Sequence, residues 1–147
     1  MINYSMPFIK HLLLFIALCI SNNIISQSII KVFVDAPKTA KIEKEFMVTV
    51  AIQKQQEGTG KLIYKLPKGF EAYPKDIGKA IFKFEDNTIR LFWVKLPSQN
   101  TFIASFMVKI TNDAKIGYQA INGHFLFNSH IKREKINLTP FYIEVIR

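Results

Sequence analysis

The stretch KAIFKFEDNTIRLFWVK, residues 79–95, decides the fold. Two apolar runs flank Asp86-Asn87, a pair of residue types that tolerates positive φ and suits a two-residue hairpin turn. Because side chains alternate along a strand, a turn at this point places three cross-strand pairs on one side. These pairs are Phe84–Ile89, Phe82–Leu91 and Ala80–Trp93. One register gives one apolar face, so the sequence predicts a β-hairpin at the centre of the core.

Strand-like alternation continues on both sides of this hairpin, with no helical periodicity after residue 27. The predicted strands cover residues 30–34, 46–53, 61–66, 101–110, 118–127 and 139–146. We expect residues 70–78 to form a loop, and Asn122-Gly123 to form a tight turn or a bulge. About eight or nine short strands separated by turn residues are typical of an antiparallel β-sandwich, so residues 27–147 are predicted to form one all-β domain.

The core of that sandwich can be predicted from the apolar sides of the strands. Trp93 shares its side of the hairpin with Leu91, so we interpret it as a core residue rather than a sugar-stacking platform. The predicted core residues are Phe46, Val48, Val50, Phe82, Phe84, Leu91, Trp93, Phe102 and Phe106.

Residues 1–26 have the pattern of an export signal, with a nine-residue apolar run, LLLFIALCI, at 12–20. That run is too short to span a bilayer as a helix, and Ser26 is a small residue that suits cleavage before Gln27. The alternatives are an uncleaved membrane anchor, or a lipid on Cys19, although Leu18 departs from the small residue that a lipobox requires. We therefore expect an exported protein of the periplasm or the cell surface, with membrane contact only if the N-terminus is uncleaved.

Several exported bacterial domains resemble this chain. The matching segments are VDAP at 34–37, FMVTV at 46–50, LPKGF at 66–70 and PFYIEV at 140–145. Together they resemble immunoglobulin-like and cohesin-like β-sandwich domains, without the cysteine and tryptophan arrangement of antibody domains. The resemblance implies an adhesion, scaffolding or assembly module, and a cohesin-like module implies a protein partner of the dockerin type.

The residues that could carry catalysis are few and scattered. Cys19, the one cysteine, lies in the predicted signal, so the domain has no thiol for a disulfide, a zinc site or a nucleophile. His124 and His130 lack acidic partners at metal-ligand spacing. No phosphate-binding loop, nucleophile elbow or calcium loop is present. We therefore expect a protein that is not an enzyme and that uses no cofactor or metal.

Charge gives the strongest functional signal, because the formal net charge is +9. In the hairpin register Lys83 lies opposite Arg90, and like charges directly across a sheet repel each other. If the preceding strand neighbours the hairpin, five cations lie on one outward side, with exposed Phe92 beside them. These candidate binding residues are Lys61, Lys65, Lys79, Lys83, Arg90 and Phe92.

Two functional hypotheses follow from that surface. The first is a non-catalytic module that binds a protein partner, an anionic surface or an anionic glycan; we expect no nucleic-acid partner. The second is a small carbohydrate-binding or carbohydrate-active protein that stacks sugars on exposed aromatics such as Phe92 and Tyr73. A third reading of the cations, edge strands protected from aggregation by lysine, needs no partner.

Overall fold

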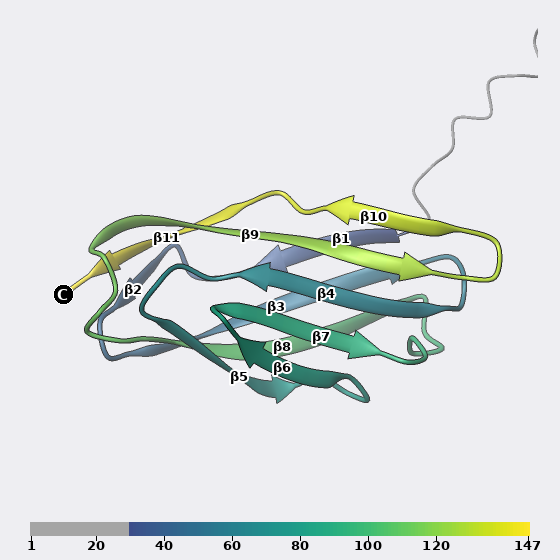
Figure 1. Ribbon diagram of the computed structural model, residues 1–147, viewed down its shortest axis with the longest axis horizontal. Helices are drawn as coiled ribbons and strands as arrows, with labels where there is room; N and C mark the ends of the chain where they lie inside the picture. The colour runs from purple at the N-terminus through teal and green to yellow at the C-terminus, as the bar shows by residue number, and fades with distance from the viewer. Residues whose placement is uncertain (1–29) are drawn as a thin grey trace, which may run out of the picture.

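The computed structural model describes residues 30–147, which fold into two packed β-sheets (Figure 1). One sheet has four strands in the order β1-β3-β8-β5, and the other has seven, in the order β2-β11-β9-β4-β7-β6 with β10 paired to β9. The strands are β1 (Ile30–Asp35), β2 (Thr39–Lys41), β3 (Glu45–Lys54), β4 (Thr59–Lys65), β5 (Phe70–Asp76), β6 (Ile81–Glu85), β7 (Thr88–Trp93), β8 (Thr101–Ile110), β9 (Gly117–Asn128), β10 (Arg133–Asn137) and β11 (Phe141–Ile146). The predicted signal, its cleavage site and Cys19 lie outside the described residues.

The predicted hairpin is present as β6 and β7. Its turn residues Asp86 and Asn87 have φ values of 50° and 54°, as a two-residue turn of this hand requires. The ladder pairs Phe82 with Leu91 and Phe84 with Ile89, which confirms the register predicted from the sequence. Pairing ends at Ile81 and Phe92, so the predicted cross-strand pair of Ala80 and Trp93 is not part of the ladder.

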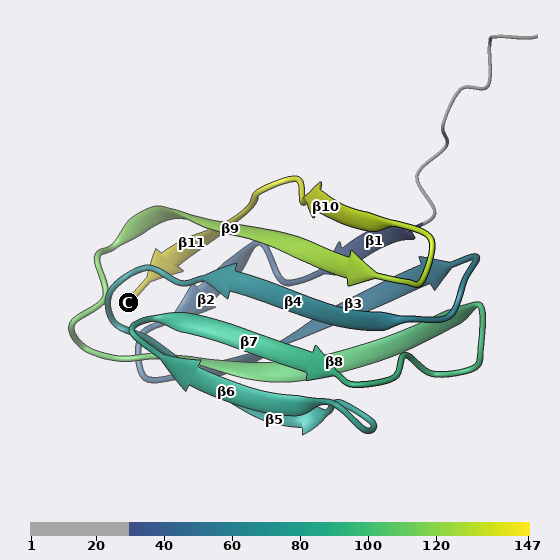
Figure 2. The same cartoon turned by 45° about the vertical axis from the view of Figure 1, so that its right-hand side comes forward.

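The two sheets lie face to face, with β4 and β7 in front of β3 and β8 (Figures 1 and 2). The core between them contains the predicted Phe46, Val48, Val50, Leu91, Trp93, Phe102 and Phe106, all of which are buried. Phe82 and Phe84 were expected to be buried as well, but they are only partly covered. The reason is that β6 is the edge strand of its sheet, so no neighbouring strand covers their outer side.

The prediction of a loop at residues 70–78 is wrong, because Phe70–Asp76 forms strand β5 at the edge of the four-stranded sheet. Pro74 interrupts the sequence pattern of a strand, but an edge strand tolerates proline on its unpaired side. The register of β5 with β8 shifts between Pro74 and Asp76, so Lys75 is the extra residue of a bulge.

The expected turn or bulge at Asn122-Gly123 is also wrong, because β9 runs through both residues in an unbroken register with β4. A Cβ on Gly123 would lie 2.4 Å from Tyr64 Cδ1, so the absent side chain makes room for the Tyr64 ring opposite. On the edge of β9 away from β4, Gly123 lies where the neighbouring strand changes from β11 to β10. Its carbonyl accepts a hydrogen bond from Leu138 N at 3.0 Å, between the segments of β9 that pair with β10 and with β11.

Strands β2 and β10 were not expected. β2 has only three residues and pairs in parallel with β11, so the sandwich is antiparallel except at this edge. β10 lies in a polar, basic stretch whose composition is typical of a surface loop. It pairs with the C-terminal part of β9. Within residues 30–147 no helix is long and apolar enough to cross a membrane.

A basic face on the seven-stranded sheet as candidate functional site

Lys61 lies at the centre of the outward side of the larger sheet. The register places Phe92 of β7 on one side of Lys61 and Leu126 of β9 on the other. Beyond Phe92 the row continues to Ile81 of β6, and beyond Leu126 it continues to Lys135 of β10. One row of outward side chains therefore crosses five strands, in the order Lys135, Leu126, Lys61, Phe92 and Ile81.

A second row lies two residues along the strands. It runs Asn137, His124, Ile63, Arg90 and Lys83. We call the outward side of β10, β9, β4, β7 and β6 the basic face; its cations are Lys61, Lys65, Lys83, Arg90, Arg133 and Lys135. The expectation that β4 neighbours the hairpin is confirmed by the β4–β7 ladder.

The predicted like-charge pair is present, since Lys83 pairs with Arg90 in the ladder. However, Glu85 neutralises it: one of its carboxylate oxygens lies 2.7 Å from Lys83 Nζ and 3.9 Å from an Arg90 guanidinium nitrogen. The hydrogen bond and the charge of Lys83 lower the pKa of Glu85, and Arg90 lowers it further. The repulsion expected between Lys83 and Arg90 is therefore offset within the chain itself.

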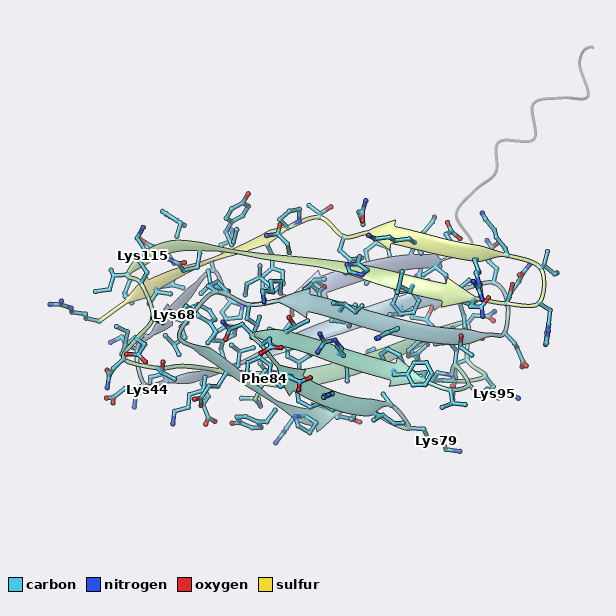
Figure 3. All side chains as sticks on the ribbon, viewed as in Figure 1. Lys44, Lys68, Lys79, Phe84, Lys95 and Lys115 are labelled. Carbon is cyan, nitrogen blue, oxygen red and sulfur yellow. The ribbon has the colours of Figure 1, made fainter. Side chains whose placement is uncertain are left out.

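Two other predicted cations have different surroundings. Lys65 Nζ donates hydrogen bonds to the Asp86 carbonyl and, at 3.4 Å, to Thr88 Oγ1, so it holds the hairpin turn. Lys79 lies in the turn between β5 and β6 and projects at the lower edge of the sandwich in the view of Figure 3. Among the predicted cations, Lys61 is thus the one at the centre of the basic face, and it makes no hydrogen bond or ion pair within residues 30–147.

A groove of about 530 Å³ lies on this face beside Lys61. Leu126 and Phe92 give it apolar walls, and Lys61, Arg133 and Lys135 place cations around it. The carboxylate among its lining residues belongs to Glu134, which lies 3.7 Å from Lys132 Nζ. The groove is therefore suited to an anionic group attached to an apolar segment.

His124 reports the potential of this surface. Partial burial lowers its pKa, and the charges of Lys135 and Lys61 lower it further. Both lysines act on one imidazole although they come from strands on opposite sides of β9. Lys61 and Lys135 therefore both act at the position of His124.

Sequence reasoning missed the contribution of β10. Arg133 and Lys135 reach the basic face because alternate residues of β10 point outward beside β9. The signal was the alternation of Arg133, Lys135 and Asn137 with the less exposed Glu134 and Ile136. Within residues 30–147 no group of three or more His, Cys, Asp or Glu side chains could hold a metal ion.

Comparison with known proteins defines the fold. No protein-family model and no curated protein matches the sequence. Among solved structures, the cohesin module of a family 33 glycoside hydrolase from Clostridium perfringens superposes with a TM-score of 0.62 at 7% identity, covering 81% of this chain and 98% of that module. The chain has a cohesin-like β-sandwich fold.

Two other β-sandwich domains resemble it more distantly. The CARDB domain of a Pyrococcus furiosus protein gives a TM-score of 0.49 at 14% identity over 80% of this chain and 87% of that one. The collagen-binding domain of a Staphylococcus aureus adhesin gives 0.45 at 12% identity over 77% and 96%. The immunoglobulin-like and cohesin-like fold class predicted from the sequence is confirmed.

Proposed function

We propose that the chain is a non-catalytic assembly or adhesion module that binds an acidic protein surface through its basic face. The observation that carries this proposal is the row from Lys135 to Ile81, in which two cations lie among three apolar side chains and no carboxylate intervenes. The likeness to a cohesin module is compatible with a binding role.

The two kinds of side chain in this row supply different parts of an interaction. Cations at a surface attract and orient an acidic partner over a distance of about one Debye length, roughly 8–10 Å in physiological salt. Apolar side chains such as Phe92, which is 37% exposed, add area that a partner removes from water. A surface with both is suited to specific contact rather than to general solubility alone.

A titration with poly-L-glutamate as the acidic probe tests the proposal. We compare the protein with a Lys61→Glu, Lys135→Glu double variant, which reverses two charges in the row. A Lys44→Glu, Lys115→Glu variant is the matched control, because both of these lysines lie at an end of the sandwich (Figure 3). The row variant should bind at least about tenfold more weakly and depend less on salt, while the control changes little. Equal losses of affinity in both variants would mean that binding depends on the overall charge of the protein and not on the basic face.

The second candidate, glycan binding, is favoured by one observation. Phe92 is exposed on the open face and borders the groove with Lys61, where a sugar ring could stack beside a cation. A glycan array separates the two functions. Selective binding of neutral sugars that persists in high salt, and that is lost in Phe92→Ala, supports the carbohydrate function.

Export to the periplasm or the cell surface is part of the proposal. It is supported by the short apolar run at residues 12–20 and the small residue Ser26. The mature protein should begin near Gln27, and mass spectrometry of the exported form checks this. An intact Met1 or a lipid on Cys19 would overturn it.

A further inference from the structure

The outward side of the four-stranded sheet has a different character from the basic face. Its register aligns two apolar rows, Phe33–Ala51–Ile103 and Met47–Met107–Tyr73. Phe33 is 54% exposed, Met47 is 50% exposed and Ile103 is 63% exposed. Large apolar side chains gathered in this way on a flat sheet are typical of an interaction surface.

Carboxylates surround these apolar rows. Between the two apolar rows lies a third row, which runs from Asp35 through Thr49 and Ser105 to Asp76. Glu45 and Glu71 flank Lys109 in the row beyond Tyr73, and a hydrogen bond joins Glu45 to Tyr73. We call the outward side of β1, β3, β8 and β5 the acidic face; its carboxylates are Asp35, Glu45, Glu71 and Asp76, against Lys31, Lys109 and Lys75 of the β5 bulge.

The two outward faces of the sandwich are thus complementary in charge. Six cations and Glu85 lie on the basic face, whereas carboxylates outnumber cations on the acidic face. Exposed apolar side chains lie among the charges on both faces, Phe92 and Ile81 on the basic face and Phe33 and Met47 on the acidic face. We propose that the acidic face of one copy docks on the basic face of a second copy, so that the chain assembles head to tail.

Several arrangements of two copies are conceivable, and charge favours this one. Pairing two basic faces would bring Lys61, Lys135 and their neighbours against the same residues, and pairing two acidic faces would bring carboxylates against carboxylates. Packing an acidic face on a basic face brings opposite charges together and removes exposed apolar side chains of both copies from water. Such a heterologous contact leaves one face free at each end, so it produces open chains or closed rings.

This inference rests on the proposed function, because it names an acidic surface that the basic face would accept. Its failure can still be distinguished. If the protein stays monomeric while poly-L-glutamate binds in the way described above, the head-to-tail contact is overturned and the proposed function stands.

The experiment is analytical ultracentrifugation of the full chain at increasing protein concentration in low and in high salt. The mass should rise with concentration in low salt and return to that of a monomer in high salt, since exposed charge contacts are screened. Lys61→Glu with Lys135→Glu should abolish association, and so should Glu45→Lys with Glu71→Lys.

Mixing the two variants gives the decisive result. The first variant keeps an unaltered acidic face and the second keeps an unaltered basic face. Neither should self-associate, but an equimolar mixture should, because it brings these two unaltered faces together. Restored association also shows that both variants are folded, because a misfolded chain would not regain a specific contact by charge complementarity. Association that survives reversal of the basic face, or a mixture that stays monomeric, would overturn the head-to-tail arrangement.

Discussion

Trp93 packs edge-on against Phe102, with ring centroids 5.5 Å apart and an angle of 68° between the ring planes. Trp93 belongs to β7 and Phe102 to β8, so this contact joins the two sheets across the core. Both rings are buried, and Phe125 packs against the Trp93 ring at 6.4 Å. The hairpin is therefore held to the opposite layer at this point.

Replacing Trp93 with Ala should lower the free energy of unfolding by about 3–5 kcal/mol, the range for a large buried aromatic that leaves a cavity. In a domain of this size the melting temperature should fall by more than about 10 °C, measured by circular dichroism. Phe92→Ala is the matched control, because Phe92 is the neighbouring aromatic on the exposed side of the same strand. A Trp93→Ala melting temperature like that of Phe92→Ala would contradict the register of β7.

Tyr64 is fully buried, and its hydroxyl has no hydrogen-bond partner among residues 30–147. A buried hydroxyl without a partner costs about 1–3 kcal/mol of desolvation. Tyr64→Phe should therefore leave the melting temperature unchanged or raise it, whereas Tyr64→Ala should lower it strongly. A clear loss of stability in Tyr64→Phe would show that the hydroxyl is satisfied.

The same residue gives a dependence on pH. Burial raises the pKa of Tyr64 above its ordinary value of 10.0, so above that pH the unfolded chain loses a proton that the folded chain keeps. The folded state is then penalised, and stability falls as the pH rises. Denaturant titrations above about pH 10 should show a smaller fall in Tyr64→Phe than in the parent protein.

Gly123 should not tolerate a side chain. Its Cβ would lie 2.4 Å from Tyr64 Cδ1 and 2.7 Å from the Ile63 carbonyl oxygen, so β4 and β9 would have to separate. Gly123→Ala should cost about 1–3 kcal/mol, as overpacking usually does. Adding Tyr64→Leu should recover part of that loss; no recovery would place the strain at the backbone of Ile63 instead.

The hairpin could be predicted because local rules agreed there. Asp86-Asn87 set the turn, and only one register placed Phe82 and Leu91 on the same side. The face of each strand followed from alternation, which is why the core position of Trp93 was also predictable. Partial burial of Phe84 was not, because edge or centre is a property of the whole sheet rather than of one strand.

The candidate site was only half predictable for a similar reason. Lys61 and Phe92 lie in segments whose strand character is strong, and their pairing follows if β4 neighbours β7. Lys135 comes from β10, which reads as a polar loop and becomes a strand only because β9 extends beyond β11 and offers an unpaired side. Glu85 could have been found as the partner of Lys83, because residues two apart on a strand point to the same side.

Removing the charge of Glu85 should change binding in the opposite direction to reversing the charges of the lysines. Glu85→Gln removes the carboxylate between Lys83 and Arg90 and makes the basic face more positive. Binding of poly-L-glutamate at low salt should therefore become stronger, with a melting temperature close to that of the parent protein because the ion pair is exposed. Weaker binding in this variant would mean that Glu85 orders the site rather than opposing the ligand.

The most direct test of the basic face is an NMR titration of His124 with and without saturating poly-L-glutamate. Burial, Lys135 and Lys61 hold the pKa of His124 below its ordinary value of 6.5. An acidic segment bound beside these lysines offsets their charge, so the pKa should rise on binding, and affinity should increase as the pH falls through it. If poly-L-glutamate saturates the protein and the pKa of His124 does not move, the ligand lies elsewhere and the basic face is not the binding site.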